Sequence, residues 1–139
     1  MTELQFATLY AKCWNNLEFA LIEPFLAEDV VYESQEVLTP LIGKAAVSEY
    51  LSGKMVSIKK SIVTSDVYAE IGYCGSQKGR GVRLFGSEGR PCVLVAQGDI
   101  KTPLALVLLQ VTNDEIQRID ICTVVPHPST AIRTGVYPE

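Results

Sequence analysis

Apolar residues recur every three or four positions in the first part of the chain and every second position in several later stretches. The first set is Phe6, Leu9, Tyr10, Cys13 and Trp14. This spacing places one apolar stripe along a helix. Thr2 and Gln5 have the spacing of a capping box, which starts a helix by satisfying its first backbone N–H groups. We therefore expect a helix from about residue 2 to Asn15-Asn16.

Two further helices are expected before residue 60. One runs from about Leu17 to Ala27-Glu28-Asp29, with Pro24 kinking or restarting it because proline removes a backbone donor. Its inward residues would be Phe19, Leu21, Ile22, Phe25 and Leu26. The other begins near Lys44, after a loop punctuated by Pro40 and Gly43. Its apolar stripe would contain Val47, Tyr50 and Leu51.

The remaining pattern is typical of strands. An alternating run follows Asp29, and further runs cover residues 61–64, 67–73, 82–85, 92–97, 104–109 and 116–125. Residues 104–109 are continuously apolar, which predicts a central strand covered on both faces. Asn113-Asp114 predicts the turn of a hairpin. Helices followed by strands favour an α+β fold with a curved, mostly antiparallel sheet.

Composition narrows the function classes. The chain has 139 residues, which suits a single domain, and a net charge of −4, which argues against nucleic-acid binding. The start is polar and acidic and no apolar run approaches a membrane span, so we expect a cytoplasmic protein that does not enter a membrane. The cysteines, Cys13, Cys74, Cys92 and Cys122, form no C-x-x-C pair and are expected as packed, reduced thiols. No metal and no cofactor is expected.

Residues 25–51 carry a resemblance to a known family. Phe25-Leu26-Ala27-Glu28-Asp29-Val30 leads into a strand, and Gly43-Lys44 opens the helix that runs to Leu51. This order resembles the nuclear transport factor 2-like superfamily, which includes polyketide-cyclase-like proteins, ketosteroid isomerases and scytalone dehydratase. The resemblance implies one domain over residues 1–126, an arm over residues 127–139, and a cone-shaped cavity between three helices and the sheet. It also implies a homodimer formed through the outer sheet face.

The same resemblance allows the catalytic groups of one known mechanism to be compared with the residues of this chain. Ketosteroid isomerase-like members use a strand carboxylate as a base, a tyrosine on the first helix, and a second, protonated acid. By position the tyrosine corresponds to Tyr10, the base to Ser34, and the second acid to Val107 or Leu108. Alternation places Glu33 on the strand face opposite Ser34. The chain therefore keeps one of the three groups, and the steroid-isomerase mechanism is not expected.

The candidate pocket residues are mostly aromatic. Tyr10 and Trp14 lie one helical turn apart, and Tyr32 and Ser34 share one face of a strand. By family position Ile119, Ile121 and Thr123 would face the cavity. Arg118 and Asp120 would then lie on the outer face. The alternative is that the aromatic residues belong to an ordinary core and that their polar ends bind backbone carbonyls.

Three function hypotheses remain open. The first is a protein that binds an apolar or aromatic small molecule in the cone without chemistry. The second is an isomerase, cyclase or dehydratase that uses Tyr10 as a hydrogen-bond donor. The third is a dimeric interaction module. His127, the only histidine, lies between two prolines and is not expected to be catalytic. The basic segment 78–90, with Lys78, Arg80, Arg83 and Arg90, is expected as a solvated hairpin rather than an anion site.

Overall fold

A computed structural model covers the chain and describes residues 1–34, 39–60, 66–75, 88–123 and 130–139. The long helices are α1 (Glu3–Asn16) and α2 (Lys44–Lys60), and two short 3-10 turns, η1 (Phe19–Leu21) and η2 (Glu23–Phe25), lie between them. The strands are β1 (Leu26–Ser34), β2 (Leu41–Ile42), β3 (Val67–Cys74), β4 (Pro91–Gln97), β5 (Ala105–Thr112), β6 (Glu115–Thr123) and β7 (Ala131–Val136).

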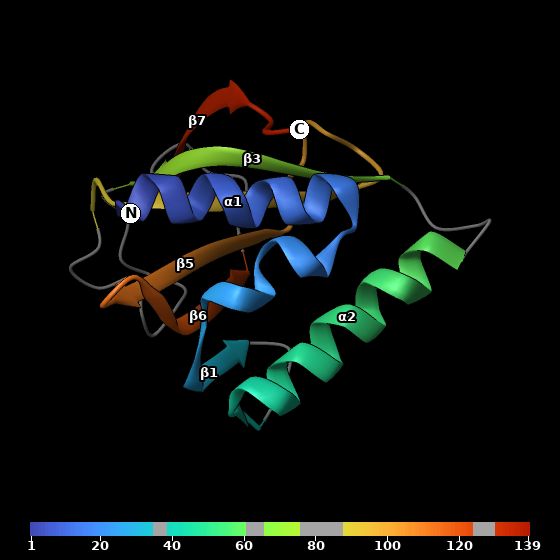
Figure 1. Ribbon diagram of the computed structural model, residues 1–139. Coiled ribbons are helices and arrows are strands. Elements are labelled where there is room, and N and C mark those ends of the chain that lie inside the picture. The colour runs from blue at the N-terminus through green and yellow to red at the C-terminus, as the bar shows by residue number, and fades with distance from the viewer. Residues whose placement is uncertain (35–38, 61–65, 76–87, 124–129) are drawn as a thin grey trace.

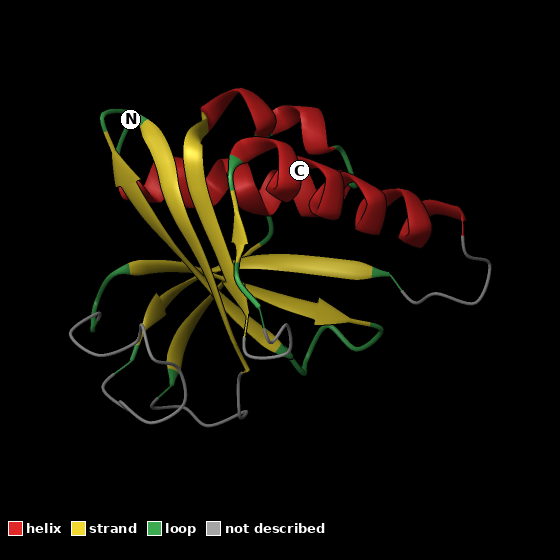
Figure 2. Ribbon diagram, turned by 90° about the horizontal axis from the view of Figure 1, so that it is seen from below, coloured by secondary structure: helices red, strands yellow, loops and turns green. Residues whose placement is uncertain are grey.

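The strands form one sheet in the order β2-β1-β6-β5-β4-β3-β7. All neighbouring strands pair antiparallel except β1 and β6, which run parallel. The sheet is strongly curved, and the helices lie on one side of it (Figure 2). The α+β fold with a curved, mostly antiparallel sheet is therefore confirmed.

The first helix begins and ends as its sequence predicts. The Thr2 hydroxyl accepts from Gln5 N at 3.1 Å, and Gln5 Oε1 accepts from Thr2 N at 2.8 Å, which completes the capping box. Leu17 then takes a left-handed conformation with φ of 50° and stops the helix. In Figure 1, α1 lies along the curved sheet, where it contacts β3, β4 and β5.

The second expected helix does not form. Residues after Leu17 make only η1 and η2, and the segment predicted as the end of that helix, Ala27-Glu28-Asp29, belongs to β1. Pro24 lies inside η2, where its missing N–H prevents a longer helical ladder. Leu26, Ala27 and Val30 are buried and Glu28 and Asp29 are exposed, with an irregularity in the pairing with β6 between Leu26 and Val31. Strand pairing with β6 thus overrides the apolar spacing that suggested a helix.

The helix that begins at Lys44 is confirmed. It buries Val47, Leu51 and Met55. It contacts β1, β2 and η1, and its last turns extend beyond the sheet (Figure 1). Gly43 precedes it with φ of 100°, a conformation that favours glycine. Gly43 is therefore the single residue that connects the end of β2 to the start of α2.

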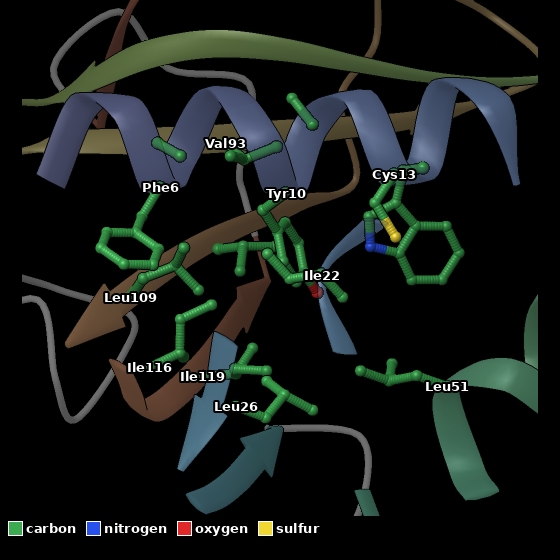
Figure 3. Packing of buried hydrophobic residues seen from close by; sticks show 14 of the residues in the cluster. Phe6, Tyr10, Cys13, Ile22, Leu26, Leu51, Val93, Leu109, Ile116 and Ile119 are labelled. Atoms are coloured by element: carbon green, nitrogen blue, oxygen red, sulfur yellow. The ribbon is translucent and has the colours of Figure 1, made fainter. Parts of the chain in front are cut away.

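Both faces of the sheet carry apolar residues. The inner face and the helices form the larger core, and Figure 3 shows Phe6, Tyr10 and Ile22 converging with Leu109, Ile116 and Ile119. The outer face carries a second cluster: Cys74, Cys92, Leu94, Leu106, Leu108 and Cys122. The expectation of a central strand covered on both faces is confirmed for residues 105–109, whereas Leu104 precedes β5 and is 56% exposed.

The segment expected as an arm contains β7. This strand pairs with β3 and lies at the edge of the sheet, which Figure 1 shows in red beside β3. Several expectations fall outside the described residues. They are the strand at 82–85, the role of His127, and the basic residues Lys78, Arg80 and Arg83. Arg90, the remaining member of the basic segment, binds Glu3 at 3.1 Å and the carbonyl of Leu109 at 3.0 Å. Among the described residues, no helix is both long and apolar enough to cross a bilayer.

Candidate functional site

A cavity opens between α2 and the inner face of the sheet. It has two adjoining parts, of about 180 and 90 Å³. Both parts are lined by Tyr32, Lys54, Val95, Gln97, Ala105 and Ile121. Tyr10 and Trp14 line only the smaller part, and Ser34 and Tyr50 line only the larger one. The cavity lies on the inner face of the curved sheet, where strands β1, β4, β5 and β6 all contribute lining residues.

Tyr10 reaches the cavity from the middle of α1. Figure 3 shows its ring leaving the helix toward Ile22 and Ile119, and the residue is 1% exposed. Burial raises the pKa of its hydroxyl, so the phenol stays protonated throughout the physiological range. Among the described residues this hydroxyl finds no hydrogen-bond acceptor. The Tyr10 hydroxyl can therefore donate its hydrogen to a bound ligand without breaking a hydrogen bond to another described residue.

Trp14 lies one turn further along α1. Its ring packs edge-on against Tyr10, with centroids 6.5 Å apart. The indole N–H lies near the Tyr10 hydroxyl and partly offsets the rise in its pKa, yet Nε1 is buried without an acceptor in hydrogen-bonding geometry. A buried N–H without a partner costs about 1–3 kcal/mol. Helix α1 thus presents two hydrogen-bond donors to the smaller part of the cavity.

Two more aromatic rings and a lysine form the wall on the side of α2. Tyr32 of β1 and Tyr50 of α2 have centroids 5.3 Å apart. Lys54 follows Tyr50 by one helical turn, and its Nζ lies 5.9 Å from the Tyr50 ring centroid, within the range of a cation–π contact. Lys54 is exposed at the helix surface yet lines both parts of the cavity.

The predicted pocket residues divide into three groups. The structure brings Tyr10, Trp14, Tyr32, Ser34 and Ile121 together around the cavity. Ile119 is fully buried in the core beneath it and is not part of the lining. The backbone of Thr123 pairs with Ala105 at the end of β6. Their roles in binding a ligand stay predictions.

Sequence reasoning missed Lys54, Val95, Gln97 and Ala105. One signal was available, because Tyr50 and Lys54 are separated by four positions and must lie on the same helix face. The other three lie on β4 and at the start of β5, and their position depends on the pairing of these strands. Pairing between distant segments leaves no mark in the local pattern, so these residues were not identifiable in advance.

The positions expected for the isomerase set hold no acid. Ser34 and Val107 both line the cavity, and neither carries a carboxylate. Leu108 belongs to the outer cluster. Glu33 binds Arg118 at 3.4 Å, as its placement on the strand face opposite Ser34 predicts. Among the described lining residues there is neither a carboxylate nor a histidine.

The outer face holds a partly buried ion cluster of Arg118, Asp120 and Glu33. Arg118 binds Asp120 at 3.1 Å as well as Glu33, and the Asp120 side chain is only 7% exposed. The hydrogen bond with Asp120 raises the pKa of Arg118. The expectation that Arg118 and Asp120 point outward agrees with this geometry, and dimerisation through this face stays a prediction.

The four cysteines are buried and unbridged, as predicted. Burial raises the pKa of Cys13 to about 12 and that of Cys122 to about 11. A hydrogen bond with Cys74, followed by burial, raises the pKa of Cys92. Thiols of this kind are poor nucleophiles because they remain protonated. Among the described residues, no group of histidine, cysteine and acidic side chains is arranged to hold a metal ion.

Comparison with known proteins identifies the fold. No family model and no curated protein matches the sequence. Solved structures do match. One is a SnoaL-like protein of unknown function from Burkholderia thailandensis, with 16% identity, a TM-score of 0.59, and coverage of 87% of this chain and 92% of that one. Another is a steroid delta-isomerase from Pseudomonas aeruginosa, with 16% identity, a TM-score of 0.58, and coverage of 93% and 85%.

A third match bears the name of the fold. It is a nuclear transport factor 2-like protein of unknown function from Cytophaga hutchinsonii, with 9% identity, a TM-score of 0.55, and coverage of 89% of this chain and 91% of that one. The chain has the nuclear transport factor 2-like fold. At sequence identities of 9–16% these comparisons establish the fold and no activity.

Proposed function

We propose that this protein binds an apolar or aromatic small molecule in the cavity of its nuclear transport factor 2-like fold and does not use the ketosteroid isomerase mechanism. One observation carries the proposal. The Tyr10 hydroxyl, protonated and without an acceptor among the described residues, borders a cavity whose walls are mostly apolar or aromatic. Ligand sites combine such walls with a few polar groups that fix orientation.

The size of the cavity sets the class of ligand. Its two parts measure about 180 and 90 Å³. An apolar cavity of about 150 Å³ is large enough for benzene. The space therefore suits a ligand of one ring, or one ring with a short substituent, rather than a steroid. Tyr10 would donate to an oxygen or nitrogen acceptor on that ligand.

An enzyme of the isomerase or dehydratase kind is the second candidate, and Tyr10 is the observation that favours it. A phenol that stays protonated can stabilise a developing oxyanion. Proton transfer also requires a base within hydrogen-bond reach of the substrate. The described lining residues include no aspartate, glutamate or histidine that could act as this base. Binding without chemistry is therefore the stronger proposal.

A binding experiment tests the first proposal. Trp14 is the only tryptophan and lines the cavity, so its fluorescence reports occupancy. One-ring aromatic compounds should quench or shift this fluorescence, and calorimetry should confirm a single site. Ala105→Phe, which adds a ring to the wall of both parts of the cavity, should abolish binding. Ala45→Phe adds the same ring at an exposed position of α2 and should leave binding unchanged.

Two results would overturn the proposal. One is the absence of binding by any one-ring compound to the folded protein. The other is equal binding by Ala105→Phe and Ala45→Phe, which would place the ligand elsewhere. Tyr10→Phe then separates the two candidates. Loss of turnover of a converted compound would favour the enzyme, whereas weaker binding without any turnover supports a binding protein.

A further inference from the structure

Lys54 is the one charged side chain in the described lining of the cavity. The other lining residues with polar side chains are Tyr10, Trp14, Tyr32, Ser34, Tyr50 and Gln97. Cys122 also borders the larger part, but its side chain belongs to the outer cluster. No acidic residue accompanies them in the described lining. A single charge of one sign beside an apolar cavity raises the local concentration of ligands of the opposite sign.

The ammonium group of Lys54 is not neutralised within the described chain. Its one contact with a partner there is the cation–π contact with the Tyr50 ring, at 5.9 Å. No carboxylate among the described residues lies within 4.0 Å of it. The contact with Tyr50 orients the side chain along the cavity wall but leaves all three N–H donors available.

The two polar groups that α1 presents to the smaller part of the cavity are also donors. An indole N–H can only donate, and the Tyr10 hydrogen has no acceptor among the described residues. A ligand that satisfies such a wall must bring acceptors. A ligand cation would instead meet the like charge of Lys54, which is unfavourable.

We propose that Lys54 makes this cavity select aromatic carboxylates over neutral and cationic compounds of the same size. The inference rests on the proposed function and adds the chemical class of its ligand. The ring would lie against Tyr32, Val95 and Ile121, and the carboxylate would lie at the open end, beside Lys54. Because Lys54 is exposed, solvent screens the attraction, so the preference is modest.

The test compares three compounds that share one ring: benzoate, benzamide and benzylamine. Trp14 fluorescence and calorimetry measure their affinities for the full chain at pH 7. We expect benzoate to bind about threefold to tenfold more tightly than benzamide, and benzylamine to bind most weakly. Raising the salt concentration from about 0.05 to 0.5 M should weaken the binding of benzoate alone, because salt screens exposed charges.

Three variants assign the preference to the charge of Lys54. Lys54→Gln should weaken benzoate about fivefold and leave benzamide within about twofold. Lys54→Arg keeps the charge and should keep the preference. Lys59→Gln removes the same charge from the same helix, outside the lining, and should behave as the wild type.

The possible outcomes distinguish a failure of the carboxylate selectivity from a failure of the proposed binding function. Equal affinities for benzoate and benzamide, or equal effects of Lys54→Gln and Lys59→Gln, would overturn the selectivity while leaving the binding function in place. If none of the three compounds binds, the proposed function fails and the selectivity fails with it. A preference that follows the charge at position 54 supports both.

Discussion

Asn15 binds Ala69 through both ends of its side-chain amide. Oδ1 accepts from Ala69 N at 2.7 Å, and Nδ2 donates to Ala69 O at 2.8 Å. Nδ2 also donates to the carbonyl of Pro138 at 2.7 Å. The amide thus continues the edge of β3 beyond the point where β7 stops pairing with it, and it joins the end of α1 to the last residues of the chain.

Asn15→Ala should lower the free energy of unfolding by about 1–3 kcal/mol, because it leaves a partly buried backbone N–H and carbonyl without partners. Urea denaturation measures the change. Asn16→Ala is the matched control, since Asn16 is exposed and its one hydrogen bond to a described residue goes to the carbonyl of Lys12 in its own helix. Equal losses in the two variants would show that the amide of Asn15 has no special role.

A buried carboxylate attaches β7 to the sheet. Glu70 is 2% exposed, and its oxygens accept from Arg133 Nε at 2.9 Å and from Gly135 N at 2.8 Å. Arg133→Met should destabilise the protein by about 2 kcal/mol, less than a fully buried pair because the Arg133 side chain is 39% exposed. The loss arises because the buried charge of Glu70 is left without its counterion.

A double-mutant cycle checks this assignment. Glu70→Gln removes the charge and keeps the shape, so Arg133→Met should cost much less in that background. Additive losses across the cycle would contradict a direct interaction. Hydrogen exchange of the β7 amides gives a second measurement, because a detached strand exchanges at a rate close to that of an unfolded chain.

Leu106 tests the second apolar cluster. It is fully buried on the outer face of β5, and Leu106→Ala should cost about 2–5 kcal/mol because it removes methylene groups and leaves a cavity. Leu104→Ala makes the same chemical change two residues earlier, at a position that is 56% exposed. Thermal and urea denaturation should show little change for Leu104→Ala. A loss below about 0.5 kcal/mol at Leu106 would contradict its place in the core.

The sequence predicted the elements whose signals are local. The capping box of Thr2 and Gln5, the apolar stripe through Tyr10 and Trp14, and the turn at Asn113-Asp114 each act over a few residues, and each forms. Both turn residues have positive φ, of 54° and 57°, as a tight hairpin requires. The helix expected after Leu17 failed because its apolar spacing is compatible with a strand once β6 is available to pair with it.

The candidate site was predictable only in part, for the same reason. Tyr10, Trp14, Tyr32 and Ser34 could be found because each pair shares one helix face or one strand face. Gln97 and Ala105 meet them only through the curvature of a sheet built from distant segments. Lys54 was overlooked because a lysine on an exposed helix face is ordinary, and its importance depends on the cavity beside it.

Alkaline pH should destabilise the protein through its buried thiols. The pKa of Cys13 rises from the ordinary 9.0 to about 12, chiefly through burial. Between these values the unfolded chain loses the proton and the folded chain keeps it, so stability is fully present below pH 9 and falls as pH rises toward 12. Each such group lowers the free energy of unfolding by about 1.4 kcal/mol per pH unit in that window.

Cys13→Ala should make the decline of the unfolding free energy with pH shallower by about 1.4 kcal/mol per pH unit, which is the contribution of one titrating group. The slope with pH is the quantity to compare, because the variant also loses packing and starts from a lower stability. Met55→Leu is the matched control: Met55 Sδ lies 4.0 Å from Cys13 Sγ, and its replacement alters the same contact without removing a titrating group. Urea denaturation at pH 8, 9, 10 and 11 measures the slopes. Identical slopes in the wild type and Cys13→Ala would show that Cys13 ionises as readily in the folded chain as in the unfolded one.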